Sequence, residues 1–168
     1  MKNIILIGMP GAGKSTVGVI LAKVLGYNFV DSDIVIQQKE GRTLREIIQE
    51  EGAEGFIAIE NRIHAEMEYS NSVIATGGSV VYGQEAMAHL KEMGTIIYLK
   101  LSYKTILHRL HDIKNRGVVL KDGQTLQNLY DERTLLYEKY ADEVIIEDGL
   151  SVEQTIENVL RVCKSKEM

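Results

Sequence analysis

A glycine-rich loop, residues 8 to 16, directly follows the apolar run IILI. It reads GMPGAGKST and fits the pattern GxxxxGK[ST]. In such a loop the glycines let backbone N–H groups turn toward a triphosphate, the lysine reaches the β- and γ-phosphates, and the next hydroxyl can ligate Mg²⁺. The helix that begins at the lysine adds the positive end of its dipole. The loop therefore predicts a nucleoside triphosphate bound together with Mg²⁺.

We assign the loop to ATP, with Lys14 on the transferred phosphate and Ser15 on the metal ion. The predicted ATP-binding residues of the loop are Gly8, Gly11, Ala12, Gly13, Lys14, Ser15 and Thr16. An ordinary glycine-rich turn is the alternative. It is disfavoured because strand, loop and helix occur in the order that phosphate binding needs.

Two carboxylates follow the next apolar run. Asp31 and Asp33 are two positions apart at the end of a predicted strand, where such side chains share a face. One carboxylate can bind Mg²⁺ through water, while the other accepts a hydrogen bond from an acceptor hydroxyl and orients it for attack. The alternative is that Asp33 only caps a helix that starts at Ile34. Beside a phosphate loop we favour the catalytic role.

Two further segments are candidates for contact with a ligand. Gly77 and Gly78 follow the apolar run VIAT, and a glycine pair at a strand end lets the backbone approach a substrate closely. Residues 111–123 lie between two helical patterns and contain Arg116 among several charged residues. Phosphoryl transfer needs cations and exclusion of water, so we expect a mobile lid here. A plain turn and a solvated basic loop are the respective alternatives.

Five short apolar runs alternate with helical patterns and must position these residues. They cover residues 4–7, 29–31, 73–76, 95–99 and 144–146. Continuous apolar runs are typical of strands buried on both faces. The alternation predicts an α/β fold, a three-layer sandwich in which helices flank a five-stranded parallel sheet. Ligands bind at the carboxyl ends of such strands, so the candidate residues should meet in one cleft.

Capping residues mark several helix ends. The first helix is expected to stop at Gly26, where a left-handed cap is easily adopted. Thr43 with Glu46, and Ser151 with Gln154, have the spacing of capping boxes that start two later helices.

Length and composition indicate one domain that spans residues 1–168. The chain is 45% hydrophobic and contains no stretch that resembles a linker. A net charge of −5 with scattered Lys and Arg argues against nucleic acid or an acidic membrane surface as a partner. Cys163 is the only cysteine, and neither a secretory signal nor a transmembrane stretch is recognisable. We expect a cytoplasmic monomer.

Together these motifs resemble the shikimate kinase family, small P-loop kinases of the nucleoside-monophosphate-kinase-like fold. The resemblance covers nearly the whole chain. It rests on GMPGAGKST, on DSD at 31–33, on Phe56 and Glu60 of an FRxxE-like helix, on ATGG at 75–78, on Arg116, on RTLLY at 133–137 and on YAD at 140–142.

The resemblance implies ATP- and Mg²⁺-dependent phosphorylation of a ring hydroxyl of shikimate, which gives shikimate 3-phosphate. Arg109 would contact the adenine, and a substrate-binding helical region would span about residues 33–62. The catalytic residues would be Lys14 and Arg116 on the phosphoryl group and Asp33 on the acceptor hydroxyls. The substrate-binding residues would be Asp33, Gly77, Gly78, Ser79 and Arg133, the last on the carboxylate. Ser15 and Asp31 are assigned to the metal.

Three positions depart from the family pattern. Ile57 stands where FRxxE carries the arginine that clamps the substrate carboxylate, Ser79 replaces the third glycine of GGG, and RGVV at 116–119 replaces RPLL. A charged hydrogen-bonding partner such as that arginine contributes about 1.5 to 3 kcal/mol. Two alternatives therefore stay open: a related kinase for another small hydroxylated metabolite, and a nucleotide-binding regulatory or interaction protein without catalysis.

Overall fold

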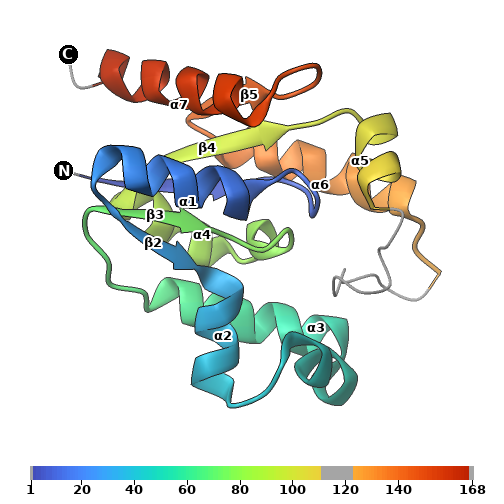
Figure 1. Ribbon diagram of the computed structural model, residues 1–168. Coiled ribbons are helices and arrows are strands. Elements are labelled where there is room, and N and C mark those ends of the chain that lie inside the picture. The colour runs from blue at the N-terminus through green and yellow to red at the C-terminus, as the bar shows by residue number, and fades with distance from the viewer. Residues whose placement is uncertain (1, 111–122, 167–168) are drawn as a thin grey trace.

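The computed structural model describes residues 2–110 and 123–166, which form a three-layer α/β arrangement (Figure 1). Five parallel strands make one sheet in the order β2-β3-β1-β4-β5. The strands are β1 (Asn3–Ile7), β2 (Asn28–Asp31), β3 (Ser72–Ala75), β4 (Gly94–Lys100) and β5 (Glu143–Ile146). Each predicted apolar run overlaps one of these strands, and the predicted parallel sheet is confirmed.

Helices cover both faces of the sheet. α1 (Lys14–Leu25) and α7 (Val152–Lys166) pack on one face, and α4 (Gln84–Met93) and α6 (Leu126–Tyr140) on the other (Figure 1). The remaining helical elements are α2 (Ser32–Glu40), α3 (Leu44–Ala65), the 3₁₀ turn η1 (Val80–Tyr82) and α5 (Tyr103–Arg109). In residues 2–110 and 123–166, no helix has the length and apolar character needed to cross a membrane.

The helix ends follow the predicted caps in most places. Gly26 is left-handed with φ 70°, and both capping boxes have their paired hydrogen bonds. The start of α2 differs from the alternative considered for Asp33. Asp31 is the N-cap, and its Oδ1 accepts from the N–H of Asp33 at 3.0 Å. The interpretation of Asp33 as the capping residue is therefore wrong, because the carboxylate of Asp31 caps the helix.

A second, smaller core holds α2 against α3 and so fixes one wall of the site. Its fully buried members are Ile36, Ile47, Phe56, Ile63 and Met67. Within α3, Gly52 has φ 73° and ψ 179°, which interrupts the helix. The sequence patterns did not reveal this break. The helix after it carries Phe56 and Glu60 on one face, because residues four apart lie one above the other.

The side chain of Asn3 joins three segments at the amino ends of the central strands. It is buried, and its Nδ2 donates to the carbonyl oxygens of Tyr69 (2.7 Å) and Met93 (3.2 Å). Its Oδ1 accepts from the N–H of Ser72 at 3.0 Å. Asn3 thereby satisfies backbone groups at or just before the starts of β3 and β4, of which the Ser72 N–H is buried.

We expect Asn3→Ala to lower the free energy of unfolding by about 2 to 4 kcal/mol, because a buried backbone group left unpaired costs about 1 to 3 kcal/mol. Urea denaturation measures the change. Asn158→Ala is the control, since that side chain meets Arg161 at the surface, and it should change stability by less than about 0.5 kcal/mol. Equal midpoints for the Asn3 variant and the parent chain would contradict the anchoring role.

Candidate active site

The loop between β1 and α1 lies at the carboxyl ends of the strands. Gly13 is the N-cap of α1 with φ 80°, a left-handed conformation that favours glycine. Gly8 has φ 149°, and a side-chain carbon there would lie 2.7 Å from the carbonyl oxygen of Leu99. Glycine is therefore required at position 8 and favoured at position 13, and the loop packs tightly against β4 at Gly8.

Lys14 is buried at the start of α1 and folds back onto the loop. Its Nζ donates to the carbonyl oxygens of Gly8 (2.7 Å) and Met9 (2.8 Å). Burial lowers the pKa of Lys14 to about 8, although the nearby carboxylate of Asp33 acts in the opposite direction. A phosphate group bound in the loop would place negative charge beside this ammonium group and stabilise its charged form.

Ser15 and Asp31, the predicted metal ligands, face each other. Ser15 Oγ donates to Asp31 Oδ2 at 3.4 Å. The described parts of the chain contain no cluster of three or more His, Cys, Asp or Glu suited to a metal ion. Mg²⁺ takes oxygen ligands and binds through one or two carboxylates together with phosphates and water. The pair therefore fits Mg²⁺ that arrives with a nucleotide.

One cavity of about 310 Å³ connects the phosphate loop with the face of α3 and the loop after β3. Its apolar walls include Leu44 and Phe56. The predicted site residues that line it are Gly11, Gly13, Lys14, Ser15, Thr16, Asp33, Gly77, Gly78, Ser79 and Arg133. Gly8 and Ala12 are buried within the loop itself. The structure thus brings the predicted residues of the phosphate loop, of α2, of the loop after β3 and of α6 into a single cleft.

Asp33 faces this cavity from α2. Burial raises its pKa to about 6, helped by Asp31 and opposed by Lys14. Its Oδ1 lies 2.8 Å from the position that a side-chain carbon on Gly77 would occupy. The carboxylate is therefore mostly ionised at pH 7, and it takes up a proton as the pH falls through about 6. A group of this kind can accept the proton of a hydroxyl that enters the cavity.

Arg133 provides a buried cation on the opposite wall, from α6. Its side chain is 1% exposed, and Cζ lies 5.5 Å from the ring centroid of Tyr82. A side-chain carbon on Gly78 would lie 2.8 Å from Arg133 Nη1 and 2.7 Å from Pro10 Cδ. Tyr137 Oη donates to the Gly78 carbonyl oxygen at 2.6 Å and fixes this loop. Glycine at 78 is thus required by close approach.

Glu60 and Ser79 form a pair that the motifs did not predict. Glu60 is buried on α3, and its Oε1 accepts from Ser79 Oγ at 2.6 Å. Burial raises the pKa of Glu60 to about 8, with a smaller lowering by the Ser79 hydrogen bond. The four-residue spacing from Phe56 signals that Glu60 shares the cavity-facing side of α3. Nothing in the sequence indicates its pairing with a residue 19 positions away.

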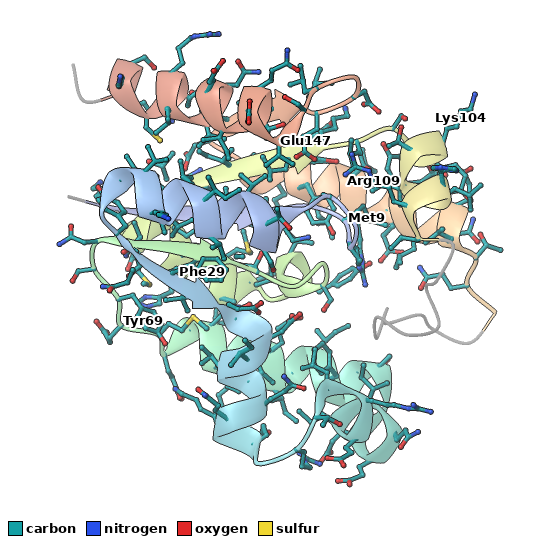
Figure 2. The ribbon with its side chains drawn as sticks, viewed as in Figure 1. Met9, Phe29, Tyr69, Lys104, Arg109 and Glu147 are labelled. Carbon is teal, nitrogen blue, oxygen red and sulfur yellow. The ribbon has the colours of Figure 1, made fainter. Side chains whose placement is uncertain are left out.

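A second buried carboxyl group lies on the nucleotide side of the loop. Arg109 is exposed on α5 and donates from Nη1 to the carbonyl oxygen of Gly11 at 3.1 Å. Glu147 follows β5 and is buried, which raises its pKa to about 7 although Arg109 and Lys14 oppose the shift. Figure 2 shows Arg109 and Glu147 beside the end of the sheet that carries Met9. Sequence reasoning identified Arg109 and missed Glu147.

Ile57 is half-buried on α3 and is not among the described residues that line the cavity. Arg116 belongs to residues 111–122, so the predicted lid, apart from Gly123, and its arginine lie outside the described residues.

The fold and the cavity together define a class. A phosphate-binding loop follows the central strand of a parallel sheet, and a buried carboxylate and arginine share its cavity, which is the organisation of a small P-loop kinase. The shikimate kinase family model matches residues 10–164. The chain belongs to the shikimate kinase family.

Individual relatives agree over almost the full length. The shikimate kinase of Persephonella marina is 35% identical over 161 residues, which cover 95% of this chain and 98% of that protein. That of Thermodesulfovibrio yellowstonii is 39% identical over 164 residues, with 96% and 94% covered. The structure of the Acinetobacter baumannii shikimate kinase in complex with shikimate superposes with a TM-score of 0.90, at 32% identity, covering 100% of this chain and 96% of that one. The predicted family and fold are confirmed.

Proposed function

We propose that the protein transfers the γ-phosphoryl group of ATP to a ring hydroxyl of shikimate, giving ADP and shikimate 3-phosphate. The observation that carries this proposal is that Lys14, Asp33 and Arg133 line one cavity of about 310 Å³. A phosphate-binding cation, a carboxylate with a pKa of about 6 and a buried guanidinium are three of the groups that this reaction needs. Membership of the shikimate kinase family supports the choice of substrate.

The chemistry follows from where these groups lie. Arg133 pairs with the carboxylate of shikimate, and Asp33 accepts a hydrogen bond from the reacting hydroxyl. The hydroxyl oxygen forms a bond to the γ-phosphorus, the bond from that phosphorus to the β,γ-bridging oxygen breaks, and the hydroxyl proton passes to Asp33. Lys14 stabilises the charge on the transferred group. Ser15 and Asp31 would hold Mg²⁺, which neutralises phosphate charge when bound.

Other parts of the proposal rest on the sequence. Arg116 would supply a second cation to the phosphoryl group, and Arg109 would contact the adenine. The net charge of −5 disfavours nucleic acid as a partner, and a single cysteine agrees with a reducing cytoplasm. We propose a monomer, which light scattering of the purified protein would test.

The experiment that tests the function is ADP release from ATP in the presence of shikimate, compared with a panel of other small hydroxylated metabolites. Shikimate should give the highest kcat/KM. A different metabolite that is clearly preferred would replace shikimate in the proposal. No acceptor-dependent turnover with any metabolite would instead favour a nucleotide-binding protein without catalysis.

Ile57→Arg should increase kcat/KM for shikimate by up to about tenfold to a hundredfold, because a charged hydrogen-bonding partner contributes about 1.5 to 3 kcal/mol. The gain is smaller if the guanidinium does not reach the carboxylate, since burying it without a partner is unfavourable. Leu135→Arg is the control, because it adds the same charge at a side chain that is 70% exposed on α6. Efficient turnover by the parent chain with no gain in the variant would show that Ile57 is harmless.

A further inference from the structure

Arg133 carries the positive charge on the acceptor side of the cavity. Among the described residues that line the cavity, Lys14 and Arg133 are the only ones with a positive charge. Lys14 belongs to the phosphate loop, so the carboxylate of an acceptor is left to Arg133. Arginine has a long side chain with many rotamers, and its planar guanidinium group binds a carboxylate best when that plane is already fixed. The contacts that fix the plane therefore decide how well the cavity holds a carboxylate.

Tyr82 lies against the guanidinium group of Arg133. The Cζ atom is 5.5 Å from the centroid of the Tyr82 ring, within the distance of about 6 Å at which an aromatic face attracts a cation. Burial raises the pKa of the Tyr82 hydroxyl, its hydrogen bond with Arg133 lowers the pKa, and one with Glu132 raises it. The hydroxyl thus accepts from the guanidinium group and donates to the Glu132 carboxylate. Ring and hydroxyl both act on the same cation.

The backbone that carries the Tyr82 ring is fixed by other helices. The N–H of Tyr82 donates to the carbonyl oxygen of Ser79 at 3.1 Å, within the 3₁₀ turn η1. Gly83, the next residue, packs so closely on α3 that a side-chain carbon there would collide with Asn61. Asn61 Oδ1 in turn accepts from the N–H of Ala86 on α4 at 2.9 Å. Tyr82 is therefore held in place by α3 and α4, whereas the guanidinium group that it contacts comes from α6.

A purely structural role for Tyr82 is the alternative. The side chain is only half-buried, and it is not among the described residues that line the cavity. A residue that merely filled the space between η1 and α6 would need no hydroxyl. The hydroxyl here bridges Arg133 and Glu132, which are neighbours on α6. This bridge favours a role in orienting the arginine.

We propose that Tyr82 is a positioning residue that fixes the guanidinium plane of Arg133, so that this single arginine can hold the carboxylate of the acceptor. Tyr82 thereby contributes to the preference of the cavity for a carboxylate-bearing acceptor without touching that acceptor itself. This inference rests on the proposed function and adds a specificity determinant to it.

The test compares the Kd of shikimate with the Kd of its methyl ester, measured by calorimetry without nucleotide. Tyr82→Leu should weaken shikimate binding about threefold to thirtyfold, as the loss of a desolvated cation–π contact predicts. Tyr82→Phe keeps the ring and loses the hydroxyl, so its affinity should lie between those of the parent and Tyr82→Leu. The ester has the same ring and hydroxyl groups but no charge, so both variants should bind it within about twofold of the parent.

Tyr69→Leu is the matched control. The Tyr69 side chain is 37% exposed, and it lies near the amino ends of the strands, away from Met9 and the phosphate loop (Figure 2). Its affinities for shikimate and for the ester should equal those of the parent. If Tyr82→Leu does not fold, Tyr82→Met takes its place, since methionine is unbranched and fills irregular space well.

Steady-state kinetics separate orientation of the arginine from a general loss of structure. In Tyr82→Leu the KM for shikimate should rise by the same factor as the Kd, while kcat and the KM for ATP stay within about twofold of the parent. In an Arg133→Met background, Tyr82→Leu should cause no further loss of kcat/KM, because the group that it positions is already gone.

Three outcomes would overturn the inference alone. They are an unchanged shikimate affinity in folded Tyr82→Leu, an equal loss of affinity for the ester, and a full additional loss in the Arg133→Met background. Each of them leaves shikimate as a substrate of the parent chain. A parent chain that does not bind shikimate would instead overturn the proposed function and this inference with it.

Discussion

Asp33→Asn is expected to reduce kcat by about a hundredfold to ten-thousandfold, while the affinity for ATP stays within about twofold of the parent value. A positioned base contributes acceleration in this range. Asparagine retains the shape of the side chain but cannot take the hydroxyl proton. Because the pKa of Asp33 is raised to about 6, kcat of the parent should also fall as the pH drops through 6. That acid limb should be absent from the variant.

Steady-state kinetics with shikimate between pH 5 and pH 8, together with calorimetry of ATP binding, provide the measurement. Asp131→Asn on the exposed side of α6, where Gln127 donates to the carboxylate, is the matched control and should behave as the parent. If ATP affinity and turnover fell together in Asp33→Asn, Asp33 would belong to the metal site. An unchanged kcat would remove it from the reaction.

Lys14→Met should reduce kcat by about a hundredfold to a thousandfold, the range found when one donor to developing charge is removed. It should also weaken ATP binding by about tenfold or more, since a hydrogen bond to a charged group contributes about 1.5 to 3 kcal/mol. In the structure the ammonium group bonds the carbonyl oxygens of Gly8 and Met9. Methionine keeps most of the apolar stem, so the loop should stay folded.

Lys23→Met is the control on the same helix, because Lys23 is exposed in the last turn of α1. Calorimetry with ATP and Mg²⁺ and the shikimate-dependent assay should distinguish the two variants clearly. Undiminished ATP affinity in Lys14→Met would contradict the assignment of the loop. A loss of thermal stability in Lys14→Met alone would indicate that its two carbonyl contacts support the fold as well.

The sheet and the nucleotide half of the site were predictable because their signals are local. The run Ile4 to Ile7 is continuous and apolar, and the glycines of the adjoining loop are dictated by backbone conformation at Gly8 and Gly13. Strand ends in a parallel sheet must meet on one edge, so the sequence also placed Asp33 and Gly77 in the same cleft. These inferences need no knowledge of side-chain packing.

The acceptor half was less predictable because its contacts join distant segments. The Ser79 hydrogen bond to Glu60 and the Tyr137 hydrogen bond to the Gly78 carbonyl each cross between elements that no spacing rule relates. The identity of the cap of α2 was also missed, since Asp31 and Asp33 have equal capping propensity and only the fold decides between them. The lid at residues 111–123 and the contact of Arg116 with the phosphoryl group stay predictions.

The position of β1 has a consequence for how the protein is made. Of the five strands β1 is synthesised first, yet its register partners come much later: Ile4 lies beside Val73 on one side and Thr95 on the other. At about 5 to 20 residues per second, roughly 5 to 20 seconds of synthesis pass before both neighbours exist. Both edges of β1 are unpaired until β3 is made, and one edge stays unpaired until β4 follows. Yield in a host cell should therefore depend on chaperones that shield nascent chains more than on the stability of the finished fold.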